Sequence, residues 1–220
     1  MEFFLVWINH AAGDTQIAVN RMSMKKGWQL YRGSNYFAVF FGDGDQVSIM
    51  DTAPVDNVWT HYLFTYDNVN QVGSLYKDGI LIESKAHAYL DDTSGPAVGS
   101  VAIGSENALT NHFWNGLLDE VKIYNKPLGE SEACLLADKS WNSILLTCGG
   151  EEDLCGNNIC DDGEDLDSCF YDCFVPPDSD LILDYNFNDV EEGAVTVVDA
   201  SSYGHNGDIQ GVTPVDGAML

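Results

Sequence analysis

The stretch from Trp59 to Leu128 constrains the fold most, because it reads as a series of short β-strands joined by turns. Within it, residues 75–82 carry apolar side chains on both sides of the pair Asp78 and Gly79. Two-residue hairpin turns of type I′ need a positive φ at both central residues, and an Asp-Gly pair adopts that conformation at little cost. The sequence therefore predicts a β-hairpin centred on this pair, and the turn fixes the register of its two strands.

Four separate motifs follow one another along the chain. They are Trp-x-His at 59–61, Tyr-x-Asp-Gly at 76–79, Ile-Gly at 103–104 and Gly-x-x-Asp-Glu-Val-x-Ile-Tyr at 116–124. In this order they resemble the laminin G-like, concanavalin A-like lectin/glucanase domains of many secreted and cell-surface proteins. The resemblance covers about residues 4–139. It implies an all-β fold, an antiparallel jelly-roll β-sandwich, with a short helix or turn near residues 129–139.

A second piece with the same resemblance stands near the C-terminus. Residues 181–188 and 198–207 look like the opening strands of such a domain. The closing part of a domain therefore comes before an opening part in this chain. Two interpretations remain open. Either the chain is a segment of a tandem array, or the tail completes the head, as a permuted domain within one chain or as a swap between chains. Swapping is a low-cost route to homo-oligomers, and an unpaired sheet edge favours association.

We accordingly divide the chain into three parts. Residues 1–147 form a laminin G-like jelly-roll that lacks its first strands. Residues 148–180 form a small, acidic, disulfide-rich connector. Residues 181–220 are the opening strands of a partial second sandwich, or the permuted or swapped strands of the first. We expect no membrane insertion, since no run of about 18 apolar residues occurs.

Negative charge is concentrated in the second half of the chain. Residues 1–147 hold 17 acids and all nine lysines and arginines, whereas residues 148–220 hold 18 acids and no base. Phosphate binding needs a basic face, so the sequence argues against a nucleic-acid partner. Solubility, cation binding and a basic partner remain as explanations of the acid excess.

The six cysteines indicate disulfides in an oxidising compartment. Four of them lie within 19 residues that cannot form a hydrophobic core of their own and therefore need cross-links. Sequence alone leaves three pairings among these four. We expect Cys134 to pair with Cys148, and the remaining four to pair among themselves: Cys155, Cys160, Cys169 and Cys173.

The connector is also a candidate calcium site. Its closely spaced carboxylates could supply the six to eight oxygen ligands that Ca²⁺ takes. Zinc is the rival, although the cysteine spacings are unlike those of common zinc sites. A solvated acidic spacer is the plainer alternative. The candidate ligands are Asp161, Asp162, Glu164, Asp165, Asp167 and Asp172.

The resemblance implies a further candidate for calcium in the sandwich itself. In related sandwich domains an Asp at the head of the last motif strand helps to bind a structural calcium, and Asp119 matches that residue. Asp189 and Asp199 of the tail are possible companions. The alternative is a surface Asp119 beside Lys122.

Catalysis is not expected. Glycosidases of this fold carry a Glu-x-Asp-x-Glu type strand that places two carboxyl groups on one face, and no such motif occurs. The five histidines show no metal-ligand spacing. His61 falls within the Trp-x-His strand motif, which favours a packing role.

The sequence therefore predicts a secreted or cell-surface module that binds glycans or extracellular proteins. Aromatic side chains near the sandwich rim could stack on sugars, although tryptophans of small sandwiches more often lie in the core. The alternatives are a structural subunit assembled by strand exchange and an accessory domain of a secreted hydrolase. The candidate ligand-binding residues are Trp28, Tyr31, Tyr36 and Trp114.

Overall fold

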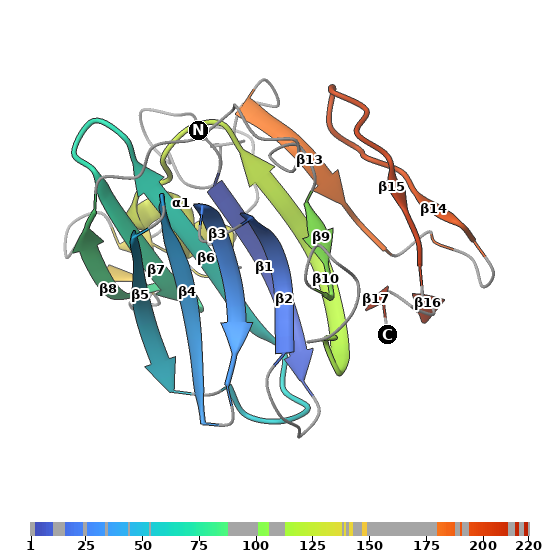
Figure 1. The fold of residues 1–220 in the computed structure, drawn as a ribbon, viewed down its shortest axis with the longest axis horizontal. Coiled ribbons are helices and arrows are strands. Elements are labelled where there is room, and N and C mark those ends of the chain that lie inside the picture. Colours follow the sequence, from blue (N-terminus) through green and yellow to red (C-terminus); the bar gives the residue numbers. More distant parts are fainter. Residues whose placement is uncertain are drawn as a thin grey trace.

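The computed structural model describes residues 3–10, 16–23, 26–33, 35–43, 45–52, 54–87, 101–105, 113–137, 139, 141–142, 147–148, 180–187, 190, 194–210, 214–215 and 218–219. These residues form antiparallel strands and one short helix (Figure 1). The all-β jelly-roll sandwich predicted from the sequence is confirmed.

The larger sheet has eight strands and contains both the last motif strand of the head and strands of the tail. Its order is β16 (Pro214–Val215), β17 (Ala218–Met219), β10 (Gly116–Tyr124), β1 (Phe3–His10), β6 (Thr60–Asp67), β7 (Val72–Lys77) and β8 (Ile80–Ala86), and β13 (Leu181–Tyr185) also pairs with β10.

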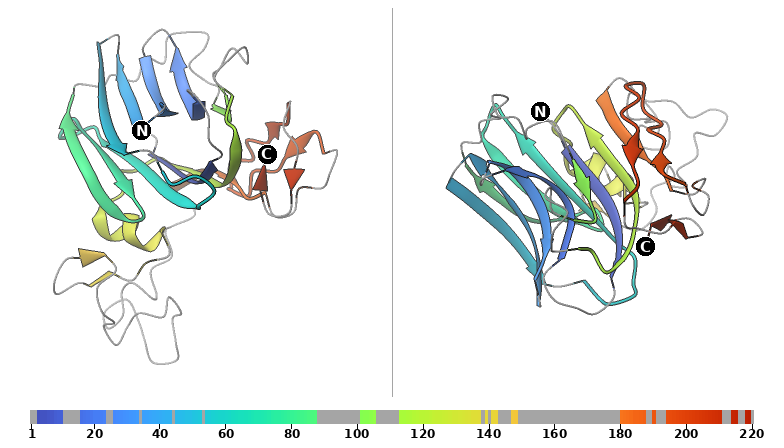
Figure 2. Two further views of the ribbon diagram at one scale, coloured as in Figure 1. Left: turned by 90° about the horizontal axis from the view of Figure 1, so that it is seen from below. Right: turned by 45° about the vertical axis from the view of Figure 1, so that its right-hand side comes forward.

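The smaller sheet has five strands and faces the larger one (Figure 2). Its order is β5 (Asp45–Thr52), β4 (Tyr36–Asp43), β3 (Lys26–Arg32), β2 (Gln16–Ser23) and β9 (Ala102–Ile103). Two further pairs of short strands are β11 (Trp141–Asn142) with β12 (Thr147–Cys148), and β14 (Thr196–Val197) with β15 (Gly207–Asp208).

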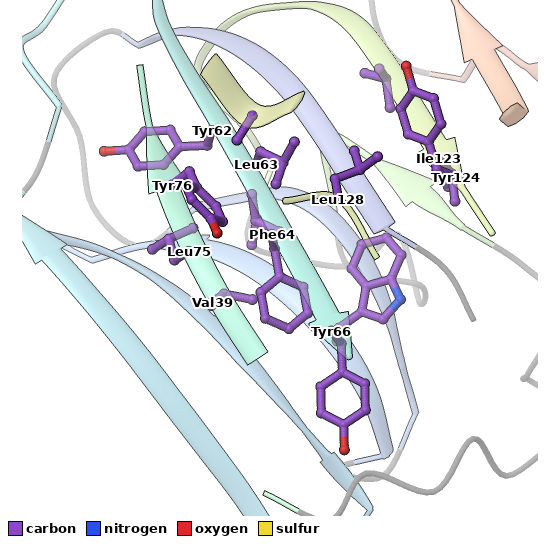
Figure 3. Packing of buried hydrophobic residues seen from close by; sticks show 14 of the residues in the cluster. Val39, Tyr62, Leu63, Phe64, Tyr66, Leu75, Tyr76, Ile123, Tyr124 and Leu128 are labelled. Carbon is purple, nitrogen blue, oxygen red and sulfur yellow. The ribbon is translucent and has the colours of Figure 1, made fainter. Parts of the chain in front are cut away.

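The hydrophobic core lies between the two sheets and is rich in aromatic rings. Phe37 of β4 stacks on Tyr62 of β6 with ring centroids 3.9 Å apart, and Phe41 packs at 5.0 Å from Phe64. Figure 3 shows the β6 side chains among their buried neighbours. Aromatic side chains contribute much of the buried apolar area of such a core, so these contacts hold the two sheets together.

The outer side of the larger sheet is covered near β6 to β8 by α1 (Glu130–Leu135) and the segment before it (Figure 2). The backbone N–H of Leu128 donates to Oγ1 of Thr65, and the α1 region therefore buries this face of β6. The helix is shorter than the sequence predicted, since it ends at Leu135 rather than near Lys139.

The predicted hairpin turn is present between β7 and β8. Asp78 has φ 48° and Gly79 has φ 78°, the positive values that a type I′ turn requires. The Asp78 carboxylate accepts a hydrogen bond from the backbone N–H of His61 at 3.0 Å. This turn also lies against the Cys134–Cys148 disulfide, because a Cβ on Gly79 would lie 2.7 Å from Sγ of Cys148.

The tail adds to the head within the same chain. β13 runs antiparallel to β10, with Leu183 opposite Ile123 and Tyr185 opposite Val121. Leu183, Tyr185, Phe187 and Val197 are buried and join the same core cluster as the head. In this structure the tail therefore packs on the head of its own chain, while the division of the chain into domains stays a prediction.

Candidate functional site

Aromatic side chains gather on the outer face of the smaller sheet, the face turned away from the core. Residues 28, 30 and 32 of β3 and residues 37, 39 and 41 of β4 are buried between the sheets. Side chains alternate along a strand, so the residues between them point outward. Those that are partly exposed there include Tyr31, Tyr36 and Phe40, while Met50 of β5 is 50% exposed. We call these four residues the aromatic face.

The rings of the aromatic face contact one another. Tyr31 and Tyr36 stack with centroids 6.0 Å apart and an interplanar angle of 29°. Phe40 meets Tyr31 edge-on, at 5.5 Å and 89°. In the strand register Ala38 lies between Tyr31 and Met50, and its small side chain is fully buried beneath its larger neighbours. The result is a continuous apolar surface across β3, β4 and β5.

The ring of Tyr36 packs against the backbone of Gly33. The N–H of Gly33 donates to the carbonyl oxygen of Tyr36 at 2.9 Å, and a Cβ on Gly33 would lie only 2.5 Å from Cζ of the ring. The Tyr36 ring therefore contacts the backbone of a residue without a side chain, and this contact restricts the orientation of the ring. Burial, together with a side-chain hydrogen bond to Tyr31, raises the pKa of Tyr36 above its ordinary value. The tyrosine thus remains neutral at physiological pH.

The aromatic face carries no charge among its described residues. Gln29, Ser48 and Thr52 are its polar neighbours on the same side of the sheet, by register with Phe40 and Tyr36. No described helix or strand lies over this face (Figures 1 and 2). An uncovered surface of stacked rings with a few hydrogen-bonding groups beside it is suited to binding a ligand that is partly apolar and partly polar.

The structure brings two of the four predicted aromatic residues together and places the other two elsewhere. Trp28 is 3% exposed and lies in the core, so its indole offers no surface to a ligand. Trp114 is partly buried against the core, just before β10, and its backbone N–H donates to the carbonyl oxygen of Gly104. Phe40 and Met50 were missed. Side chains alternate between the two faces of a strand, so Phe40 and Tyr36 lie on the same face of β4. The sequence does not say which face of β4 points to the core, and for that reason it did not identify Phe40 as exposed.

Asp119 lies in an irregular part of β10. Glu120 has φ 49°, and the pairing of β10 with β1 shifts register at this point. Oδ1 of Asp119 accepts hydrogen bonds from the backbone N–H of Glu120 at 2.8 Å and from that of Phe187 at 3.5 Å. Burial raises the pKa of Asp119. This carboxyl group therefore connects the head to the tail.

Asp199 is already saturated by hydrogen-bond donors. Its two oxygens accept from the backbone N–H groups of Asp184, Ser201 and His205 and from the Ser201 hydroxyl, at 2.7 to 2.9 Å. Although burial opposes ionisation, these bonds outweigh it and hold the pKa of Asp199 below its ordinary value. The group therefore organises the tail.

The calcium site expected around Asp119 stays a prediction, because its expected companion Asp189 lies outside the described residues. No group of three or more acidic, histidine or cysteine side chains in the described ranges could hold a metal ion. Asp189 and the six connector carboxylates, from Asp161 to Asp172, lie outside the described residues, and so do Cys155, Cys160, Cys169 and Cys173. Calcium binding by the connector and its disulfide pairing therefore stay predictions.

Cys134 and Cys148 form the disulfide expected of these two residues, with Cα atoms 5.5 Å apart. The bond ties α1 to β12, next to the β7–β8 turn. It lies on the outer side of the larger sheet, and therefore on the opposite side of the sandwich from the aromatic face (Figure 2). Its role is structural.

The fold and the uncovered face define a jelly-roll sandwich of the lectin-like class. Residues 4–134 match the Laminin_G_3 family, described as the concanavalin A-like lectin/glucanases superfamily, and the chain belongs to this superfamily. No curated protein matches the chain. No helix among the described residues has the length and apolar character needed to cross a membrane.

Several solved structures share the fold. A Bacteroides ovatus protein with a proposed role in carbohydrate binding superposes at a TM-score of 0.61 with 15% identity, and the match covers 100% of this chain and 55% of that one. The carbohydrate-binding module of a Ruminococcus gnavus sialidase, bound to α2,3-sialyllactose, gives 0.51 with 16% identity, over 62% of this chain and 81% of that one. The binding domain of botulinum neurotoxin serotype D gives 0.50 with 14% identity, over 64% and 38%.

Proposed function

We propose that this protein is an extracellular, non-catalytic module that binds glycans on the aromatic face. The observation that carries the proposal is the stacked, partly exposed pair of Tyr31 and Tyr36, on a sheet face over which no described helix or strand lies. Sugar rings present patches of C–H groups as well as hydroxyls. Tyrosine offers an apolar ring for the former and a hydroxyl for the latter, so it suits such a ligand.

The glycan that fits this face is uncharged. The four residues of the aromatic face are uncharged. Lys85, which donates to the carbonyl oxygen of Ser48 beside this face, is paired with Glu83 at 3.2 Å, and the chain as a whole carries a net charge of −26. Like charges repel over distances set by the ionic strength, so an anionic sugar meets an unfavourable field on approach. We therefore expect preference for neutral glycans, in contrast to the sialylated ligand of the Ruminococcus gnavus module.

The names of the structural neighbours support binding rather than catalysis. A carbohydrate-binding role is attached to two of them, and one is a module of a sialidase. The chain spans 55% of the length of the Bacteroides ovatus protein, so a larger protein that contains this module could have further activities. An accessory domain of a secreted hydrolase is therefore the alternative that the neighbours favour.

The experiment is a glycan array with neutral and sialylated sugars, followed by calorimetry on the best ligand. We expect binding to a neutral class, and a loss of affinity of at least tenfold in Tyr36→Ala. The matched control is Tyr203→Ala, since Tyr203 is 49% exposed but belongs to the tail. Equal affinity of Tyr36→Ala and wild type would overturn the site. Repeating the array in millimolar calcium and in chelator tests the calcium prediction separately.

A further inference from the structure

The tail meets the head along β10, with which both β13 and β17 pair, and through side chains that enter the shared core. β13 pairs with β10 alone, and at its start the N–H of Asn125 donates to the carbonyl oxygen of Asp180 at 2.8 Å. At its other end the N–H of Phe187 points to Asp119. Between these two anchors Leu183 and Tyr185 enter the core beside Ile123 and Val121. The edge of β10 is therefore a surface that accepts added strands, chiefly β13.

The tail is also organised by bonds within itself. Asp199 accepts hydrogen bonds from Asp184, Ser201 and His205, and the Ala200 N–H donates to the carbonyl oxygen of Asp184. The Tyr185 hydroxyl donates to the carbonyl oxygen of His205. These contacts all lie between residues 184 and 205. They would be the same whichever copy of the head the tail occupied.

The covalent connection between head and tail is long. Thirty-one residues, 149–179, separate β12 from the turn that precedes β13. A fully extended chain spans at most about 3.3–3.6 Å per residue, so even with residues 155–173 cross-linked as expected, residues 149–154 and 174–179 could together span about 40 Å. The sequence therefore allows the tail to reach the β10 edge of a second molecule.

We propose that residues 180–219 are an exchangeable strand donor, and that a second copy of this chain can bind them on its β10 edge. The same hydrogen bonds and the same buried side chains would form between copies as within one copy. What differs is effective concentration, which is at most in the millimolar range for a tail linked to its own head and falls as the link lengthens. The monomer therefore prevails in dilute solution. Exchange becomes populated when the chain folds at high concentration, or when its own tail cannot dock.

A complementation experiment tests the proposal with the full chain. Leu183→Asp damages the tail and leaves the head intact, whereas Ile123→Asp damages the β10 edge and leaves the tail intact. Neither variant can complete its own sandwich. One is labelled with ¹⁵N, and the two are mixed after unfolding in urea with their disulfides intact and are diluted together. Native mass spectrometry then separates mixed dimers from either homodimer.

We expect a 1:1 mixed dimer that is at least tenfold more abundant than either homodimer, with the tail of the Ile123→Asp chain protected from proteolysis. Monomers alone, or homodimers as abundant as the mixed species, would overturn the proposal. The wild type gives a second test that needs no variant. Refolded at about 1 mM rather than about 10 μM, it should show a several-fold larger dimer fraction, since only the higher value is comparable with the effective concentration of the tail. If both variants fail to fold, an unchanged monomer fraction in the wild type overturns the proposal.

Discussion

The ring of Tyr36 lies directly on the backbone of Gly33, with no side chain between them. A methyl group at Gly33 would approach Cζ of the ring to 2.5 Å, well inside van der Waals contact, so the ring has to move. We predict that Gly33→Ala weakens glycan binding measurably, by up to about tenfold, which corresponds to a loss of binding free energy of up to about 1.4 kcal/mol. Calorimetry against the array ligand measures it. Unchanged affinity together with an unchanged near-ultraviolet circular dichroism spectrum would contradict the proposed role of Gly33.

Gly73 gives a prediction about the core. It faces the smaller sheet from β7, and a Cβ there would lie 2.5 Å from Cζ of Phe41. Overpacking of this kind costs about 1–3 kcal/mol, so Gly73→Ala should lower the free energy of unfolding by that amount. Val69→Ala is the control, because Val69 is 91% exposed, and it should change stability by less than about 0.5 kcal/mol. Urea denaturation distinguishes the two, and equal effects would refute the packing argument.

His61 makes stability depend on pH. Burial, and to a lesser extent the charge of Lys122, lowers the pKa of His61 to about 3. Below an unfolded-state pKa of about 6.5 the unfolded chain takes up a proton that the folded chain does not, so stability falls as the pH drops from there toward about 3. Between pH 7 and 5 the expected loss is about 2 kcal/mol.

The test for His61 is urea denaturation of wild type and His61→Leu at both pH values. The carboxyl groups of Asp119 and Asp184, whose pKa values are raised chiefly by burial, act in the opposite direction, but they do so in both proteins. The difference between the two proteins therefore isolates His61. Parallel pH dependences in wild type and variant would show that this residue does not contribute.

Asp199 should control the stability of the tail. Asn keeps one acceptor oxygen but replaces the other with a donor, which leaves some of the four hydrogen bonds unmade. We expect Asp199→Asn to cost about 1–3 kcal/mol. Hydrogen exchange should quicken in residues 181–208 and stay unchanged in β6. Asp208→Asn, at an exposed residue of β15, is the control and should leave both regions unaffected.

The contribution of Asp199 has a defined pH window. Since its folded pKa is held below 3.8, the stabilisation is present above pH 3.8 and is lost as the pH falls through the folded value. Protection of the tail that persists well below this window would contradict the hydrogen-bond account.

The sequence predicted the fold because the turn and strand motifs that define it depend only on residues close together in the chain. The Asp78–Gly79 turn needs only two residues with positive φ, and both have it. The motif at 116–124 coincides with β10. What the sequence left open depends on contacts between distant segments. Residues 181–188 look the same whether they begin a new domain or complete the old one, so the sequence could not predict that β13 pairs with β10.

The binding face was harder to predict for a related reason. Tyr36 and Phe40 point outward while Phe37 and Phe41 point inward, so apolar side chains occupy both faces of β4. Hydrophobicity therefore does not identify the core side, and Trp28 was grouped with Tyr31 although the two lie on opposite faces. The irregularity at Glu120, which sets the position of Asp119, has no local sequence signal because a positive φ is uncommon for Glu.

The central claim is that Tyr31 and Tyr36 together form a binding surface for neutral glycans. Calorimetry of wild type and of Tyr31→Ala/Tyr36→Ala, with the neutral glycan selected on the array, tests it most directly. We predict micromolar to millimolar affinity for the wild type, and for the double variant a loss of at least a hundredfold, about 2.8 kcal/mol, with its circular dichroism spectrum preserved. Undiminished affinity in a folded double variant, or binding confined to sialylated sugars, would contradict the account.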